Sequence, residues 1–274
     1  MKKVITIFAV CVFSLFVLGM LNAFSIPYKD IVFTFISVVI LSVGCFFLRM
    51  ETKDVKNTRR FLKTMPIRLG DFFFAVVTSV IIISSSFILN YLESTFLGFF
   101  GIEVSQSGIY GMQSGNEILL LCVVAIFPAI FEELFFRGAV LSALSKKPDV
   151  RAMIWSAIFF TLMHGSFFNI PSTLVAGFVL AAASYYSGSV YVSMIAHFLN
   201  NVLTFVLYIY SERISFSGLE TKLIAVLIPL LLINVYFFLG FVSGRLRKNV
   251  QNQGKMYNEG EKIWKQQQQE RKER

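Results

Sequence analysis

Ionisable side chains stand inside otherwise apolar stretches of this sequence, and they are the residues most able to do chemistry. Glu132, Glu133 and Arg137 lie within one run of aromatic and aliphatic residues, and the two histidines, His164 and His197, also fall in apolar segments. An ionisable group at the centre of a bilayer costs at least about 2.5 kcal/mol. We therefore expect these five residues to have partners, or a shared polar cavity, in the protein interior.

Helical geometry gives the two adjacent glutamates different neighbours. At roughly 100° per residue, Glu133 and Arg137 fall on one face at i and i+4, whereas Glu132 is rotated away. We expect Glu133 and Arg137 to pair and brace the helix, and Glu132 to point into a cavity. Pro128 removes a backbone donor just before the acidic pair, so the helix should bend there and the freed carbonyl needs another partner.

Each histidine has a companion one helical turn away. Phe160 precedes His164 by four residues and Asn201 follows His197 by four, so each pair shares a helix face. Both pairs could therefore line the same cavity. A supporting role is expected for Phe160, as for Glu133 and Arg137.

A carboxylate, two imidazoles and an amide around one cavity suit hydrolysis. Glu132 and one histidine can activate water, while the other histidine and Asn201 stabilise an oxyanion. A divalent metal such as zinc is the alternative, with Glu132, His164 and His197 as ligands and a bound water of lowered pKa. The sequence leaves both open, and it lacks a His-Glu-x-x-His helix and a Gly-x-Ser-x-Gly elbow.

The elements that must position these residues are membrane helices. Apolar residues make up 56% of the 274 residues and charged residues only 15%, more apolar than the core of a soluble domain needs. Eight apolar runs are long enough, or nearly so, to cross a hydrocarbon core. They cover residues 4–24, 31–48, 72–92, 118–136, 152–164, 173–186, 190–210 and 223–241. The expected fold is an all-α, polytopic transmembrane bundle of about eight spans.

Lysine and arginine placement orients this bundle. They cluster before the first run, in residues 49–68 and 146–151, and after residue 245, whereas residues 93–116 contain none. Because short cytoplasmic loops carry the excess positive charge, both termini are expected in the cytoplasm, in a multi-pass protein of the cell membrane. The first run is read as a retained anchor, not a signal peptide. The +9 net charge then favours contact with anionic lipid, and no nucleic-acid partner is expected.

The chain divides into four parts by composition. Residues 1–115 hold N-terminal membrane helices and loops, and residues 116–210 hold the core with the chemistry. Residues 211–243 supply the last membrane helix, and residues 244–274 form a basic cytoplasmic tail. The tail lacks apolar periodicity, so it is expected to be disordered or to lie on a surface.

Three short motifs follow one another, each in a predicted membrane segment. They read Glu132-Glu133-x-x-x-Arg137, Phe160-x-x-x-His164 and His197-x-x-x-Asn201. In this order they resemble the motifs of the CPBP intramembrane protease family, which comprises CAAX proteases and bacteriocin-processing or self-immunity proteins (the Abi family). The resemblance implies an all-helical membrane endopeptidase, labelled a metalloprotease, that cuts a membrane-associated peptide or protein. The residues matching Glu132, His164, His197 and Asn201 would carry catalysis.

Two other functions remain open from the sequence. One is a non-catalytic membrane protein for bacteriocin immunity or for regulation by scaffolding, in which the polar cluster only packs. The other is a proton-coupled transporter, since buried acidic and basic groups also mark ion pathways. The transporter is disfavoured because the sequence has no internal repeat.

Overall fold

The protein is almost entirely helical in the residues that its computed structural model describes, which are 2–20, 29–51, 61–102, 117–144, 150–164, 168–211 and 220–273. No strand occurs in these stretches. Seven helices are single units, and an eighth is a rod of five consecutive segments. The single helices are α1 (Lys2–Met20), α2 (Lys29–Glu51), α4 (Leu69–Gly98), α9 (Val150–Met163), α10 (Ile170–Ser187), α11 (Val190–Ser211) and α12 (Glu220–Glu273).

The rod lies between α4 and α9 in the chain and alternates α-helical with wider π-helical turns. Its segments are α6 (Glu117–Leu121), η2 (Cys122–Ile126), α7 (Phe127–Glu133), η3 (Leu134–Val140) and α8 (Leu141–Leu144). We refer to residues 117–144 as the central rod. It carries both glutamates of the sequence motifs.

Six of these eight helices are long and apolar enough to cross a membrane. The stretches that qualify are Val32–Glu51, Leu69–Gly98, Ile118–Leu144, Ile170–Ser187, Val190–Leu207 and Lys222–Lys248. The apolar parts of α1 and α9 are shorter, at Lys3–Leu15 and Val150–Met163. The expected all-α, polytopic bundle is therefore confirmed, and α9, with 14 residues, is shorter than a usual span.

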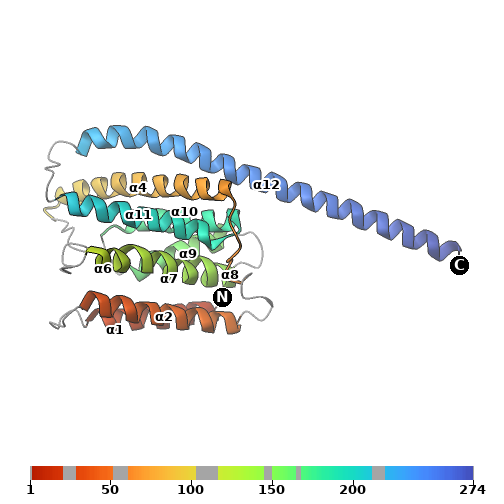
Figure 1. Ribbon diagram of the computed structural model, residues 1–274, viewed down its shortest axis with the longest axis horizontal. Coiled ribbons are helices and arrows are strands. Elements are labelled where there is room, and N and C mark those ends of the chain that lie inside the picture. The colour runs from red at the N-terminus through yellow and green to blue at the C-terminus, as the bar shows by residue number, and fades with distance from the viewer. Residues whose placement is uncertain are drawn as a thin grey trace.

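The helices lie side by side in layers (Figure 1). One layer holds α1 and α2, which pack on each other and, through α2, on the central rod. Next to the rod lie α9, α10 and α11, and beyond them α4 packs against both α10 and α11. The helix α12 lies on the far side and packs mainly on α4. The central rod is therefore enclosed on both sides by other helices.

Aromatic packing joins the outer α1–α2 layer to the central rod. Phe8 of α1 stacks on Phe159 of α9 with ring centroids 4.1 Å apart, and it meets Phe136 of the rod edge to face. Phe135 and Phe136 are fully buried. Because lipid tails are as apolar as these side chains, close van der Waals packing rather than the hydrophobic effect holds such helices together.

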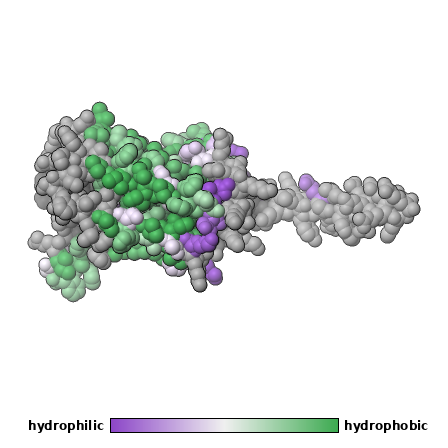
Figure 2. Space-filling view, turned by 90° about the horizontal axis from the view of Figure 1, so that it is seen from below, coloured by the Kyte–Doolittle hydropathy of each residue, from purple (hydrophilic) through white to green (hydrophobic). Residues whose placement is uncertain are grey.

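Apolar side chains cover the outside of the bundle, as expected for a protein surrounded by lipid. Large aliphatic and aromatic residues are exposed on most helices, for example Phe35, Ile118 and Tyr236. Figure 2 shows this apolar surface along the bundle, with hydrophilic residues gathered at the end from which the long helix projects. The contrast agrees with a membrane protein whose polar end faces water.

Hydrogen bonds fix the segment 61–68 against the start of α11. The hydroxyl of Ser189 donates to the Met65 carbonyl at 2.6 Å, and the Val190 N–H donates to the Lys63 carbonyl at 2.9 Å. Lys63 has a positive φ of 54°. This segment, on the side expected to be cytoplasmic, therefore caps the bundle next to the helix that carries His197.

The helix α12 continues without interruption to Glu273 and extends beyond the bundle (Figure 1). This differs from the disordered or surface-lying tail expected after residue 243. Residues 249–273 contain no proline and are rich in Gln, Glu, Lys and Arg, which are good helix formers. Lack of apolar periodicity predicts that a helix has no packed face, but it does not by itself prevent the helix from forming.

Candidate active site

Two π-helical segments flank the glutamates in the central rod. The N–H of Phe127 donates to the Cys122 carbonyl, and the N–H of Leu141 donates to the Phe136 carbonyl, each five residues back. Isolated π turns of this kind are frequent at functional sites because they widen the helix and re-aim its side chains. Pro128 is the second residue of α7, so the place where a bend was predicted lies next to η2.

The pair predicted between Glu133 and Arg137 is confirmed. Arg137 Nη1 donates to Glu133 Oε1 at 2.5 Å, and both side chains are fully buried. Arg137 Nη2 donates in addition to the backbone carbonyl of Gly177 in α10, at 3.1 Å. The guanidinium therefore ties the central rod to α10 as well as to its own helix.

The same carboxylate oxygen of Glu133 also holds His197, which is buried in α11. His197 Nδ1 lies 3.0 Å from Glu133 Oε1. An ionised carboxylate can only accept, so Nδ1 carries the hydrogen and Nε2 is left for other partners. Glu133 was expected only to brace its helix with Arg137, and the structure adds the orientation of His197 to that role.

His164 is exposed and directly follows the last residue of α9. Its Nδ1 lies 2.8 Å from the Phe160 carbonyl, which can only accept a hydrogen bond. Nδ1 therefore donates, and in the neutral ring Nε2 keeps a free lone pair. In both histidines of the chain, the hydrogen bond of Nδ1 thus fixes the ring, and Nε2 is left for other partners.

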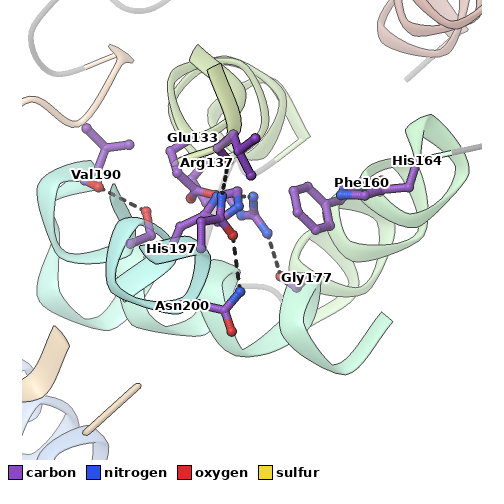
Figure 3. A network of polar contacts seen from close by, with 11 residues as sticks. Glu133, Arg137, Phe160, His164, Gly177, Val190, His197 and Asn200 are labelled. Atoms are coloured by element: carbon purple, nitrogen blue, oxygen red, sulfur yellow. Dashed lines mark hydrogen bonds and ion pairs between the residues drawn. The ribbon is translucent and has the colours of Figure 1, made fainter. Parts of the chain in front are cut away.

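The ring of Phe160 connects the two histidines and the arginine. Its centroid lies 4.5 Å from that of His164 and 5.9 Å from that of His197. The guanidinium carbon of Arg137 lies 4.3 Å from the same centroid, a cation–π geometry. Figure 3 shows Phe160 between Arg137 and His164, with Gly177 on the same side as Arg137.

Glu132 makes neither of the two ion pairs that hold Glu133. Its side chain is partly buried, and its Oε2 is buried but accepts no hydrogen bond from the residues that the structure describes. Arg137 is near enough to interact with it electrostatically. A buried carboxylate oxygen normally has a hydrogen-bond donor, so this one is suited to bind a donor from water or substrate.

Asn201 bonds away from the histidines. Its Nδ2 donates to the Val124 carbonyl of the central rod at 3.2 Å, and its Oδ1 accepts from Asn200 Nδ2 at 3.2 Å. The structure therefore links Glu133, Arg137, Phe160, His164 and His197 through direct contacts. In the described part of the chain, no hydrogen bond connects Glu132 or Asn201 to either histidine.

A metal fits this arrangement poorly. Glu132, His164 and His197 are the ligands that a catalytic metal would need, but nowhere in the described stretches do three His, Cys, Asp or Glu residues gather to hold one. In the described part of the chain, these three side chains therefore do not form a metal site.

The sequence did not single out Gly177 or Val124, because each contributes a backbone carbonyl. Gly177 does carry a detectable signal as a lone glycine inside an apolar helix. A Cβ there would lie 3.0 Å from the Ala157 Cα and 3.2 Å from a carbon of the Phe160 ring. Glycine therefore allows α10 to approach α9 closely enough for its carbonyl to reach Arg137.

The class of protein is thus a polytopic helical membrane protein with a Glu–Arg–His network between its helices. Residues 114–203 match the family model described as Rce1-like, type II CAAX prenyl endopeptidase Rce1-like. That segment is similar to CAAX-type prenyl endopeptidases, which agrees with the resemblance to the CPBP family drawn from the three motifs. It contains every residue of the site. No curated protein and no solved structure gave a match.

Proposed function

We propose that this protein is an intramembrane endopeptidase of the cell membrane that hydrolyses a peptide bond in a membrane-associated peptide or protein. The match of residues 114–203 to CAAX-type proteases supports the reaction class. Glu132 Oε2 and Glu133 Oε2 are both buried without a hydrogen-bond partner among the described residues. Only Glu133 is held through its other oxygen, by Arg137 and His197, and this difference carries the assignment of Glu132 as the reacting carboxylate. A carboxylate with a free acceptor in a low-dielectric site suits a general base.

Glu132 takes a proton from the attacking water, assisted by Nε2 of His164, whose other nitrogen is held by the Phe160 carbonyl. The oxygen of that water bonds to the scissile carbonyl carbon and produces a tetrahedral oxyanion. The proton held by Glu132 then passes to the leaving amine as the carbon–nitrogen bond breaks. These steps balance without any further reactant.

His197 and Asn201 stabilise the oxyanion. Glu133 accepts from Nδ1 of His197, which directs Nε2 of that ring away from the carboxylate. When Nε2 carries a hydrogen it can donate to the developing negative charge, as can the amide of Asn201. Arg137 keeps Glu133 ionised and in place, so this pair supports the reaction without touching the substrate.

Cleavage by the purified protein in lipid nanodiscs tests this proposal, with a membrane-associated peptide as substrate. General-base catalysis contributes about 10²- to 10⁴-fold, so Glu132→Gln should lower kcat by that factor while the protein still folds. Glu51→Gln is the matched control, since Glu51 is exposed at the end of α2 and pairs with Lys3. Undiminished cleavage by Glu132→Gln would contradict the assignment. Immunity or signalling that survives substitution of all four catalytic candidates would favour a non-catalytic scaffold.

A further inference from the structure

Pro128 leaves one carbonyl of the central rod without its α-helical donor. It stands at the start of α7, immediately after the π segment η2. The N–H of Phe127 still bonds five residues back, to Cys122, and α-helical turns resume in α7. An N–H at residue 128 would face the carbonyl of Val123, five residues back, or that of Val124, four residues back, but proline has no such hydrogen. Inside a membrane no bulk water replaces the lost bond, so the donor must come from the protein.

Asn201 supplies that donor from another helix. Its Nδ2 lies 3.2 Å from the Val124 carbonyl, although the two residues are 77 positions apart in the chain. Its Oδ1 accepts from Asn200 at 3.2 Å. Because a carbonyl can only accept, the nitrogen and not the oxygen of the amide must face Val124. Both ends of the Asn201 amide are therefore fixed.

We propose that Pro128 is a positioning residue, which keeps the Val124 carbonyl free so that this carbonyl orients the Asn201 amide for the reaction. The inference rests on the proposed function in so far as Asn201 stabilises the oxyanion. An amide nitrogen carries two hydrogens, and Val124 takes one of them. The second is then held in a fixed direction and is available to the developing oxyanion. In the α-helical register, an N–H at position 128 would compete with Asn201 for the Val124 carbonyl.

A double-mutant cycle of Pro128→Ala and Asn201→Ala tests the proposal through two readouts. In the unfolding temperature, Asn201→Ala should be destabilising in the wild-type background and nearly neutral in the Pro128→Ala background. In cleavage, Pro128→Ala should lower kcat about tenfold and leave KM within about twofold of the wild-type value. This loss of kcat is smaller than the about 10²- to 10³-fold loss expected when an oxyanion donor is removed. The double variant should have the kcat of Asn201→Ala alone.

Pro229→Ala is the matched control, because Pro229 lies inside α12, away from the central rod. Its effects should add to those of Asn201→Ala. Additive effects of Pro128→Ala and Asn201→Ala in the unfolding cycle would overturn the proposed link, as would an unchanged kcat in an active Pro128→Ala variant. The unfolding cycle needs no substrate, so coupling there without any cleavage by the wild type would count against the proposed function alone.

Discussion

Two adjacent glutamates have different surroundings because one residue step turns a helix by about 100°. Glu133 shares one oxygen between Arg137 and His197, whereas the buried oxygen of Glu132 accepts nothing from the described residues. The contacts of Glu133 fix the positions of Arg137 and His197, whereas the carboxylate of Glu132 is left able to react. Substituting each glutamate should therefore change different properties of the protein.

Glu133→Gln should destabilise the protein, in contrast to Glu132→Gln. It leaves the fully buried guanidinium of Arg137 without its counter-charge, and breaking a buried pair in this way costs about 3–5 kcal/mol. The unfolding temperature in detergent, followed by tryptophan fluorescence, measures the effect. The double variant Glu133→Leu/Arg137→Met should recover most of the stability that Glu133→Gln loses, since apolar residues of similar volume can replace a buried pair. Equal unfolding temperatures for Glu133→Gln and the wild type would contradict this account.

The i, i+4 pairing of Glu133 with Arg137 was predictable because it depends only on helix geometry. The bond from His197 to Glu133 was not, because it joins residues 64 positions apart and depends on which helices are neighbours. The backbone acceptors Gly177 and Val124 leave no side-chain signature in the sequence. The sequence thus predicted the contact within one helix, but not the contacts that join different helices.

At the scale of elements, the contact between α9 and α10 depends on a residue without a side chain. The Cβ of an alanine at position 177 would lie 3.0 Å from the Ala157 Cα and 3.2 Å from its carbonyl oxygen. Backbone atoms cannot rotate away as a side chain can. The two helices would have to separate, and the carbonyl that accepts from Arg137 would move with α10.

Gly177→Ala should therefore destabilise the protein by about 1–3 kcal/mol, the usual cost of overpacking, and should also lower kcat. Gly240→Ala in α12 is the matched control, since a Cβ there meets no atom within 4 Å. The unfolding temperatures and cleavage rates of the two variants measure the difference. A Gly177→Ala variant as stable and active as Gly240→Ala would show that the close approach is dispensable.

The apolar runs predicted the order of the eight helices in the described residues, but only six of these helices qualify as membrane spans. The π segments could not be predicted in this way, because Pro128 is the only local residue that indicates an irregular helix there. The helical continuation of α12 was missed because an exposed helix needs no apolar stripe. Runs of apolar residues thus predict where a helix crosses the membrane, but not where it ends.

At the scale of the whole molecule, charged residues gather at one end, and one of them is buried there. The Nζ of Lys63 hydrogen-bonds to none of the described residues and lies 5.1 Å from the centroid of the Tyr185 ring. Burial lowers the pKa of this amine from 10.5 to about 8. Lys63 lies in the segment before α4, outside the membrane-spanning stretches.

This shift makes stability depend on pH in a defined direction. Between pH 8 and 10.5 the unfolded chain binds more protons at Lys63 than the folded chain, so stability should rise with pH across that range. Lys63→Met should raise the unfolding temperature at pH 7 and lose this advantage by about pH 10.5. Lys222→Met, at an exposed position of α12, should follow the wild type. Parallel curves for Lys63→Met and the wild type would contradict the assignment.

The long helix α12 packs along α4 and then projects beyond the bundle. Near the end of this packing, Phe241 stacks on Phe74 with ring centroids 3.8 Å apart, and Arg245 pairs with Asp71. At about 1.5 Å per residue, Glu273 lies about 42 Å beyond Arg245. The part of α12 beyond the bundle therefore moves when the helix tilts at its contact with α4. A tilt of about 5° at that contact displaces the far end by about 4 Å, so small changes in packing at Phe74 are magnified at the end of the chain.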